Sequence, residues 1–332
     1  MSLPPANTSQ AYVAVAAILA GRITAPKWSF IDTKDMAATL SFPCLAFLIT
    51  RKTGACMTTA SNIAVAQKSP EHILFDLGLR AERRNYTEDQ QAHIKNREPV
   101  AFGPSVATTL QKNGMASTEI DWVIYSHVHW DHTGEPSDFP NASFIIGHGS
   151  SALLKRGFDA AAGSHAAFDK NLLDHRDVFE LFPNLDGGNA DDDSLDTANA
   201  SFHSPWTPLG PFPAAMDILG DGSMFVIPSP GHLQGHINLL CRVEEKRWIY
   251  LGGDTFHHRS LLTGEAEIAT WRDTEGRELC VHTNIAAAQE MFALLRKLQD
   301  QATADGVEVE IISSHDQDWY NANQDRLFPE KL

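Results

Sequence analysis

Four metal-binding side chains occur within six consecutive residues, and this run constrains the fold more than any other feature of the chain. It extends from His127 to His132, reads His-Val-His-Trp-Asp-His, and directly follows the apolar, β-branched stretch 121–126. That stretch is typical of a buried strand. A polar loop at a strand end is the alternative, but buried polar groups need partners, and a divalent metal would satisfy them together. Histidine nitrogen and carboxylate oxygen favour zinc, iron, manganese or cobalt over calcium or magnesium.

Three later segments repeat this arrangement. Predicted strands at 223–228, 247–251 and 307–312 are each followed by a His or Asp, and these residues are His232, Asp254 and His315. Taken singly, each would indicate an ordinary turn or surface residue. Side chains at successive strand ends converge on one edge of a sheet, where α/β proteins place their chemistry. Five His and two Asp are enough for two metal ions and too many for one.

The spread of these residues also bears on domain organisation. Residues 127–315 must fold together if their side chains meet, so we expect one domain over residues 1–332. Helices are predicted over 105–113 and 284–301, and a short helix or turn over 131–134. Strands are predicted over 11–19, 45–50, 73–77, 122–125, 143–146, 224–227, 238–243 and 247–251. Strands in two batches, each followed by a helix, fit two sheets packed face to face with helices outside.

Two segments are predicted to be loops. Residues 182–213 are rich in Asp and Gly and then dotted with Pro, which indicates a long loop, either a lid or a surface insertion. As a lid, it would offer Phe202, Trp206 and Phe212 as an apolar wall at the active-site edge. Residues 50–68 are predicted to form an extended hairpin connection.

Composition excludes several classes of protein. The formal charge is −16, from 42 acidic and 26 basic residues without a Lys/Arg cluster, so nucleic acid is not an expected partner. No apolar run reaches membrane-spanning length, and the N-terminus lacks the basic region of a signal peptide. The cysteines show no pairing pattern, which predicts free thiols and a cytoplasmic protein. They are Cys44, Cys56, Cys241 and Cys280.

The motifs together resemble the metallo-β-lactamase superfamily over roughly residues 40 to 316. His127, His129, Asp131 and His132 match its HxHxDH signature, His232 its third-motif histidine, Asp254 its bridging aspartate, and His315 its last ligand. The resemblance implies an α+β fold, the four-layer αβ/βα sandwich of two mixed β-sheets with outer helices. It also implies two divalent metal ions, with zinc expected. One ion would bind His127, His129 and His232, the other would bind Asp131, His132 and His315, and Asp254 would bridge them.

Further positions acquire roles only through this resemblance. Asp76 matches an early aspartate beneath the site that orients the ligand loop. His236, in the Pro-Gly-His-x-x-Gly-His stretch, is expected to be structural. His129 stands where the oxygen-reducing diiron branch has Glu, which favours hydrolysis.

The stretches 74–80, 127–134 and 230–236 look most like the N-acyl-homoserine lactonase branch. This implies a quorum-quenching lactonase in which a metal-bridging hydroxide attacks the lactone and Asp131 carries the proton. His257 replaces that branch's substrate-binding Tyr, and we expect substrate contacts from His257, Trp130 and Phe256. No GxSxG motif supplies a serine nucleophile.

Other functions remain open. A thioesterase, either glyoxalase II-like or polyketide-releasing, is the main alternative, and another ester hydrolase is possible within the same fold. The β-lactam-cleaving branch fits less well. A one-iron sulfur dioxygenase or a non-enzymatic member would have a reduced ligand set. The expected partner is a small-molecule lactone or ester, and the sequence does not determine an oligomeric state.

Overall fold

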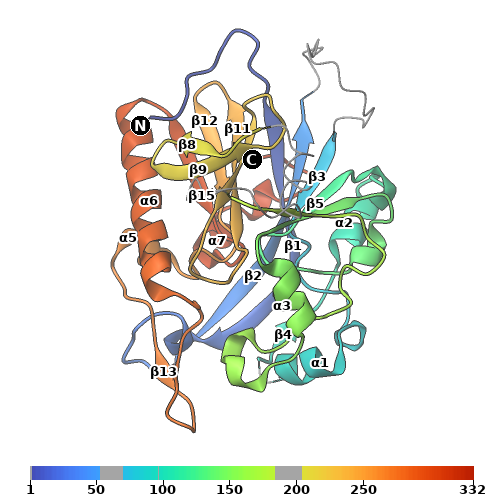
Figure 1. The fold of residues 1–332 in the computed structure, drawn as a ribbon, viewed down its shortest axis with the longest axis vertical. Coiled ribbons are helices and arrows are strands. Elements are labelled where there is room, and N and C mark those ends of the chain that lie inside the picture. The colour runs from blue at the N-terminus through green and yellow to red at the C-terminus, as the bar shows by residue number, and fades with distance from the viewer. Residues whose placement is uncertain (1, 53–69, 96, 184–203) are drawn as a thin grey trace, which may run out of the picture.

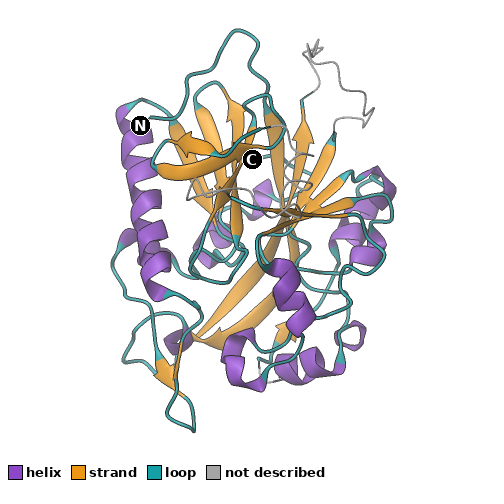
Figure 2. Cartoon of the chain, viewed as in Figure 1, coloured by secondary structure: helices purple, strands orange, loops and turns teal. Residues whose placement is uncertain are grey.

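Two β-sheets lie between outer helices in the computed structural model (Figures 1 and 2). It describes residues 2–52, 70–95, 97–183 and 204–332. The predicted hairpin connection at 50–68 therefore lies almost wholly outside the described residues.

Within the described residues, the first sheet has seven strands and joins the N-terminal hairpin to a parallel set. The pair β1–β2 is antiparallel, whereas β3, β5, β6 and β7 run parallel. Its order is β4 (Val100–Ala101), β1 (Val13–Pro26), β2 (Thr39–Arg51), β3 (His72–Phe75), β5 (Trp122–Ile124), β6 (Ser143–Gly147) and β7 (Val178–Leu181).

The second sheet has six strands in the part of the chain that the structure describes, and it is antiparallel except where β12 pairs with β15. Its order is β15 (Glu308–Ile312), β12 (Arg247–Leu251), β11 (Ile237–Glu244), β10 (Met224–Pro228), β9 (Phe212–Asp217) and β8 (Thr207–Leu209). A separate small ribbon, formed by β13 (Trp271–Arg272) and β14 (Glu278–Leu279), projects at the lower left of Figure 1.

Helices cover the outer face of each sheet (Figure 1). The long helix α6 lies outside the second sheet, and α2 and α3 pack on the first. Both predicted helices begin at a capping residue: Ser105 Oγ accepts from Thr108 N, and Asn284 Oδ1 accepts from Ala287 N. The helices are α1 (Glu88–Lys95), α2 (Val106–Lys112), α3 (Ser150–Arg156), α5 (Arg259–Thr263), α6 (Ile285–Ala304) and α7 (Gln317–Ala322).

The core follows from the two-residue period of the strands. On β2, Leu45, Phe47 and Ile49 point into the space between the sheets, while Ala46 and Leu48 face the helices. The second sheet contributes its own alternate residues to the same central core. The result is the four-layer helix–sheet–sheet–helix sandwich that the sequence predicts.

The prediction of a loop over 182–213 is wrong at its C-terminal end. β8 and the start of β9 lie within it. Pro208 is compatible with β8 because β8 is an edge strand, where a missing N–H is tolerated. Phe212 is 1% exposed and stacks on Tyr250, and Trp206 packs against the central core. Neither forms the expected wall at the active site. Phe202 lies outside the described residues.

Two further expectations concern thiols and membranes. Cys44 and Cys241 are buried free thiols and Cys280 is a partly buried one, while Cys56 lies outside the described residues. Among the helices of the described ranges, none combines the length and the apolar composition needed to cross a bilayer.

Candidate metal centre

Four strand ends bring the predicted ligands to one place. The loop after β5 carries His127 to His132, with 130–132 in a turn. His232 follows β10, Asp254 follows β12 and His315 follows β15. Since β5 belongs to the first sheet and the other three strands belong to the second, the site lies where the edges of the two sheets meet.

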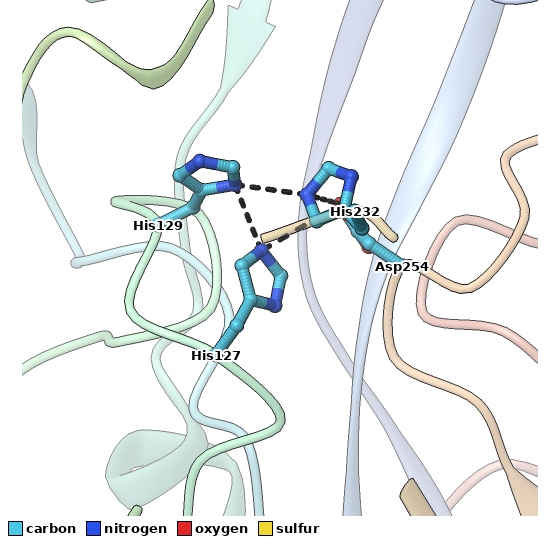
Figure 3. A group of neighbouring side chains, drawn as sticks. All are labelled: His127, His129, His232 and Asp254. Atoms are coloured by element: carbon cyan, nitrogen blue, oxygen red, sulfur yellow. Dashed lines mark hydrogen bonds and ion pairs between the residues drawn. The ribbon is translucent and has the colours of Figure 1, made fainter. Parts of the chain in front are cut away.

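The first cluster consists of three imidazoles and one carboxylate (Figure 3). His129 Nδ1 lies 2.8 Å from His127 Nε2 and 3.0 Å from His232 Nε2. Asp254 Oδ2 lies 3.3 Å from His232 Nε2 and 3.8 Å from His127 Nε2. Donor atoms on a tetrahedron around zinc would be about 3.4 Å apart, so this group could hold such an ion.

Asp131, His132 and His315 form a second cluster beside the first. His315 Nε2 is 3.3 Å from His132 Nε2 and 3.4 Å from Asp131 Oδ2. Asp254 faces both clusters, because its Oδ1 lies 3.1 Å from His132 Nε2 and 3.3 Å from His315 Nε2 while its Oδ2 faces the first cluster. One carboxylate thus presents one oxygen to each group.

Electrostatics of the buried groups suit a pair of cations. Burial lowers the pKa of His127, His129 and His232 well below the usual range, which keeps these imidazoles in the neutral form that binds metals. Burial acts in the same direction on His132 and His315, but neighbouring groups outweigh it and raise both pKa values: Asp254 acts on both, together with Asp76 on His132 and with Asp131 and Cys44 on His315. Cations between these side chains would supply that positive charge, so the donor set fits two divalent metals.

Asp76, which is expected beneath the site, contacts Ser126 and His132 of the ligand loop. It is fully buried, and its carboxylate accepts hydrogen bonds from Ser126 N at 2.7 Å and Ser126 Oγ at 2.8 Å. Its Oδ2 also lies 2.9 Å from His132 Nδ1. Asp76 adopts a positive φ of 60°, an uncommon conformation that Asp tolerates better than most residues. It therefore anchors the start of the ligand loop and orients one imidazole.

His236, for which a structural role is expected, contacts the backbone of Asp254. Its Nε2 accepts a hydrogen bond from Asp254 N at 3.0 Å, and its ring lies 5.1 Å from that of His127. It thus fixes the backbone of the aspartate that faces both clusters.

A cavity of about 380 Å³ opens onto the clusters, which is within the size range of small-molecule sites. Five of the seven predicted ligands line it, and these are His129, Asp131, His232, Asp254 and His315. Aromatic side chains dominate the remaining wall, and these are Trp28, Phe30, Phe42, Trp130 and Trp271.

Two of the three predicted substrate-contact residues line this cavity. Trp130 and His257 do so, and His257 Nε2 also lies 3.0 Å from Asp254 Oδ2. Phe256 does not: it is fully buried in the core beneath the second sheet, so the expectation of a substrate contact is wrong. The neighbouring His257 lines the cavity instead.

Three residues near the site were missed. Arg97 and His165 line the cavity, and the buried ring of His282 lies 5.4 Å from that of His232. His165 Nδ1 lies 2.9 Å from His129 Nε2. None follows a predicted strand or belongs to a spaced motif, so the sequence offers no signal for them.

Comparison with known proteins defines the class. The profile of the metallo-β-lactamase superfamily matches residues 58–300, which is more than half of the chain. The chain belongs to this superfamily, as its motifs predict.

Curated relatives match over somewhat more than half of the chain. Gamma-lactamase MBL2 of Gibberella moniliformis (strain M3125 / FGSC 7600) is 30% identical over 190 residues, which cover 56% of this chain and 71% of that protein. Metallo-hydrolase mfmC of Annulohypoxylon moriforme is 31% identical, over 58% of this chain and 47% of the relative. Cytochrome P450 monooxygenase mpaDE' of Penicillium brevicompactum is 29% identical over 58% of this chain, but the match spans only 21% of that longer protein.

Solved structures with the same fold include quorum-quenching lactonases. A B. thuringiensis AiiA variant with N-decanoyl-L-homoserine at its active site superposes with a TM-score of 0.62 at 15% identity, covering 100% of both chains. The dizinc quorum-quenching lactonase AidC has a TM-score of 0.51 at 14% identity, covering 95% of this chain and 91% of that one. At these identities the likeness concerns the fold.

Proposed function

We propose that the protein is a dinuclear metal-dependent hydrolase that opens a lactone. The observation that carries this proposal is the position of Asp254, whose two carboxylate oxygens face two separate groups of ligand atoms. Family membership and the metallo-hydrolases among the relatives support it.

The chain's own residues would divide between two ions. His127, His129 and His232 would hold one, Asp131, His132 and His315 the other, and Asp254 would contact both. Zinc is the metal proposed, since nitrogen-rich sites with carboxylate suit it, although iron, manganese and cobalt share these preferences. Such a pair supplies a nucleophile by lowering the pKa of water and polarises the carbonyl that is attacked.

Asp131 is the proposed proton carrier. It belongs to one cluster only and lines the cavity, with its side chain 13% exposed. Its carboxylate can take a proton on one oxygen while the other remains near His315 Nε2, at 3.4 Å. His257, which contacts Asp254 and lines the cavity, is placed to bind the substrate's carbonyl side with its remaining ring nitrogen, Nδ1.

A lactone is the proposed substrate because the fold neighbours include lactonases, one of them with N-decanoyl-L-homoserine bound. A ring of the N-acyl-homoserine type is therefore the first substrate to test. A second candidate is a cyclic amide, favoured by the similarity to gamma-lactamase MBL2.

A substrate panel tests this proposal. The zinc-reconstituted protein would be assayed with N-hexanoyl-homoserine lactone, dihydrocoumarin, a γ-lactam, a thioester and a β-lactam. We expect lactone opening to have the highest kcat/KM. Exclusive thioester cleavage, or no cleavage of any lactone, would contradict the proposal.

Replacing the proton carrier tests the mechanism. Asp131→Asn should lower kcat by about 10²–10⁴-fold, because general acid–base catalysis typically contributes this much, while the fold is retained. Asp138→Asn, in the 3₁₀ helix just beyond the ligand loop and outside the cavity lining, is the matched control and should retain activity. Turnover at the wild-type rate in Asp131→Asn would exclude Asp131 as the proton carrier.

A further inference from the structure

A guanidinium group lines the cavity wall and has no carboxylate partner in the part of the chain that the structure describes. Arg97 follows α1, is partly buried, and donates from Nη1 to His93 O at 2.9 Å. Within the described residues no carboxylate lies within ion-pair distance of it. Burial lowers the pKa of Arg97 to about 10, partly offset by the more distant charge of Asp131. Even so, the group stays positively charged at neutral pH.

Two other arginines are paired with carboxylates, whereas the buried Arg242, like Arg97, has no carboxylate partner among the described residues. Arg80 pairs with Asp169 at 2.9 Å and Arg259 pairs with Asp316 at 2.7 Å. The chain carries 42 acidic residues and a formal charge of −16, so a carboxylate partner would be easy to provide. Removing a charge from water without a partner costs free energy, and such a site favours an anionic ligand.

The hydrogen bond from Arg97 to the end of α1 accounts for only part of the position of this side chain. The contact with His93 O uses one of the five N–H donors of the guanidinium. The remaining donors suit a planar, two-oxygen anion such as a carboxylate. A capping role alone would not require the side chain to line the cavity that leads to the clusters.

The rest of the wall is aromatic and comes from separate parts of the chain. Trp28 and Trp271 meet edge to face with ring centroids 5.8 Å apart, and Phe30 and Phe42 do so at 4.7 Å. Trp130 adds a ring from the ligand loop. Rigid aromatic walls favour a planar aromatic group, through stacked and edge-to-face contacts.

We propose that the substrate carries, away from the bond that is cleaved, an aromatic ring held by these side chains and an anionic group bound by Arg97. The inference rests on the proposed hydrolase function and narrows its substrate class. An uncharged acyl chain would leave the guanidinium unpaired.

Matched substrates test the anionic group. Dihydrocoumarin and a dihydrocoumarin carrying a carboxylate on its benzene ring differ only in this anionic substituent. We expect the carboxylated form to have the lower KM, and Arg97→Gln to raise that KM by about 10–100-fold while leaving the KM of the uncharged form and both kcat values nearly unchanged. Arg97→Lys, which keeps the charge, should restore part of the affinity.

Arg84→Gln is the control, because Arg84 lies in the same region but its side chain is 79% exposed and it pairs with Glu82. It should leave both KM values unchanged. If Arg97→Gln changes the two substrates equally, or changes neither, the inference is overturned.

A binding measurement separates this inference from the proposed function. Indane-5-carboxylate has the aromatic ring and the anion but no bond to cleave, and the cavity tryptophans report its binding by fluorescence quenching of the metal-loaded protein. We expect at least tenfold weaker binding to Arg97→Gln than to wild type. Equal binding overturns the inference even if lactones are opened. Arg97-dependent binding without lactone opening supports the inference and refutes the lactonase.

Discussion

Each histidine of the two clusters uses one ring nitrogen toward the centre, and several use the other for a partner in the protein. His127 Nδ1 lies 3.0 Å from Ser126 Oγ, and His315 Nδ1 donates to Pro43 O at 2.8 Å. These contacts fix the ring orientation and the nitrogen that offers its lone pair. The most unusual partner is another imidazole, His165, which stacks on His129 with centroids 4.9 Å apart.

His165 should therefore contribute to metal affinity. With His129 Nδ1 as a ligand, its Nε2 carries the proton and donates it to His165 Nδ1, 2.9 Å away. Removing this acceptor in His165→Ala should weaken zinc binding by about 10–100-fold. Competition with a chelator measures the change without relying on turnover.

Two further variants make this prediction specific. His165→Gln keeps an acceptor oxygen and should restore part of the affinity. His148→Ala, at a side chain that is 55% exposed near the end of β6, should bind zinc as wild type does. Unchanged affinity in His165→Ala would show that His129 needs no such partner.

At this scale the sequence predicts the site residues that belong to a motif. It misses the site residues that only contact a motif residue in the folded protein. The ligands follow strand ends in a recognisable order. His165 is 36 residues from His129, and Arg97 follows a helix of low apolar content. Phe256 was misassigned because adjacency to His257 does not reveal which side of the backbone a side chain takes.

Among the elements, the strand that carries His315 is held by a charge cluster. Glu310 on β15 accepts a hydrogen bond from Arg247 on β12 at 2.8 Å. It also accepts hydrogen bonds from two residues that follow His315 in the sequence, Trp319 at 2.7 Å and Arg326 at 2.9 Å. Burial raises the pKa of Glu310, but the hydrogen bonds from Arg326 and Trp319 outweigh it and lower the pKa. The ionised form thus joins two strands to the C-terminal helix.

This cluster predicts a pH-dependent contribution to stability. A carboxyl whose pKa is lowered on folding stabilises the protein above its unfolded pKa and loses this effect as the pH falls through the folded value. Glu310→Gln should lower the free energy of unfolding by about 1–2 kcal/mol at pH 7, and by progressively less below about pH 4.

Denaturant unfolding across this pH range measures the effect. Glu308→Gln, at the exposed partner of Arg247, is the control and should change stability by less than about 0.5 kcal/mol. If Glu310→Gln lowered the free energy of unfolding equally at every pH, the shape of the Glu310 side chain rather than its charge would account for the stabilisation.

The approach of β10 to α6 depends on one glycine. Gly231 has φ +135°, and an added Cβ would lie 2.6 Å from Ala288 N. Gly231→Ala should therefore destabilise the protein by about 2–4 kcal/mol, since strain and overpacking combine, and should displace the adjacent His232. The denaturation midpoint measures the loss of stability, and the zinc content measures the displacement of His232.

Gly306→Ala is the matched control, because φ is +64° but no atom lies within 4 Å of the added Cβ. It should cost about 1 kcal/mol, from the backbone conformation alone, and leave zinc content intact. Equal effects of the two substitutions would show that the close approach is unimportant.

Element predictions succeeded where periodicity was strong. The helix predicted over 284–301 is observed at Ile285–Ala304, and the strand at 247–251 is observed with the same bounds. The N-terminal strand continues to Pro26, well past its predicted end at residue 19, because pairing with β2 extends it beyond its apolar part. Edge strands such as β8 have too few buried residues to give a pattern.

Over the whole molecule, the two-sheet sandwich brings distant segments to a common edge. His132 and His315 are 183 residues apart in sequence, yet their Nε2 atoms lie 3.3 Å apart. The order of the strands in each sheet could not be read from the chain, because pairing between distant strands leaves no local signal. The meeting of the ligands was predictable only from their shared position at strand ends.

The central claim is that these seven side chains hold two metal ions. The most direct test is a metal analysis. The purified protein is reconstituted with zinc, unbound zinc is removed, and the bound zinc is measured. The account predicts two equivalents per folded chain, and fewer in Asp254→Ala, in which neither cluster keeps its shared carboxylate. One equivalent or none in the folded wild-type protein, or an unchanged value of two in Asp254→Ala, would contradict it.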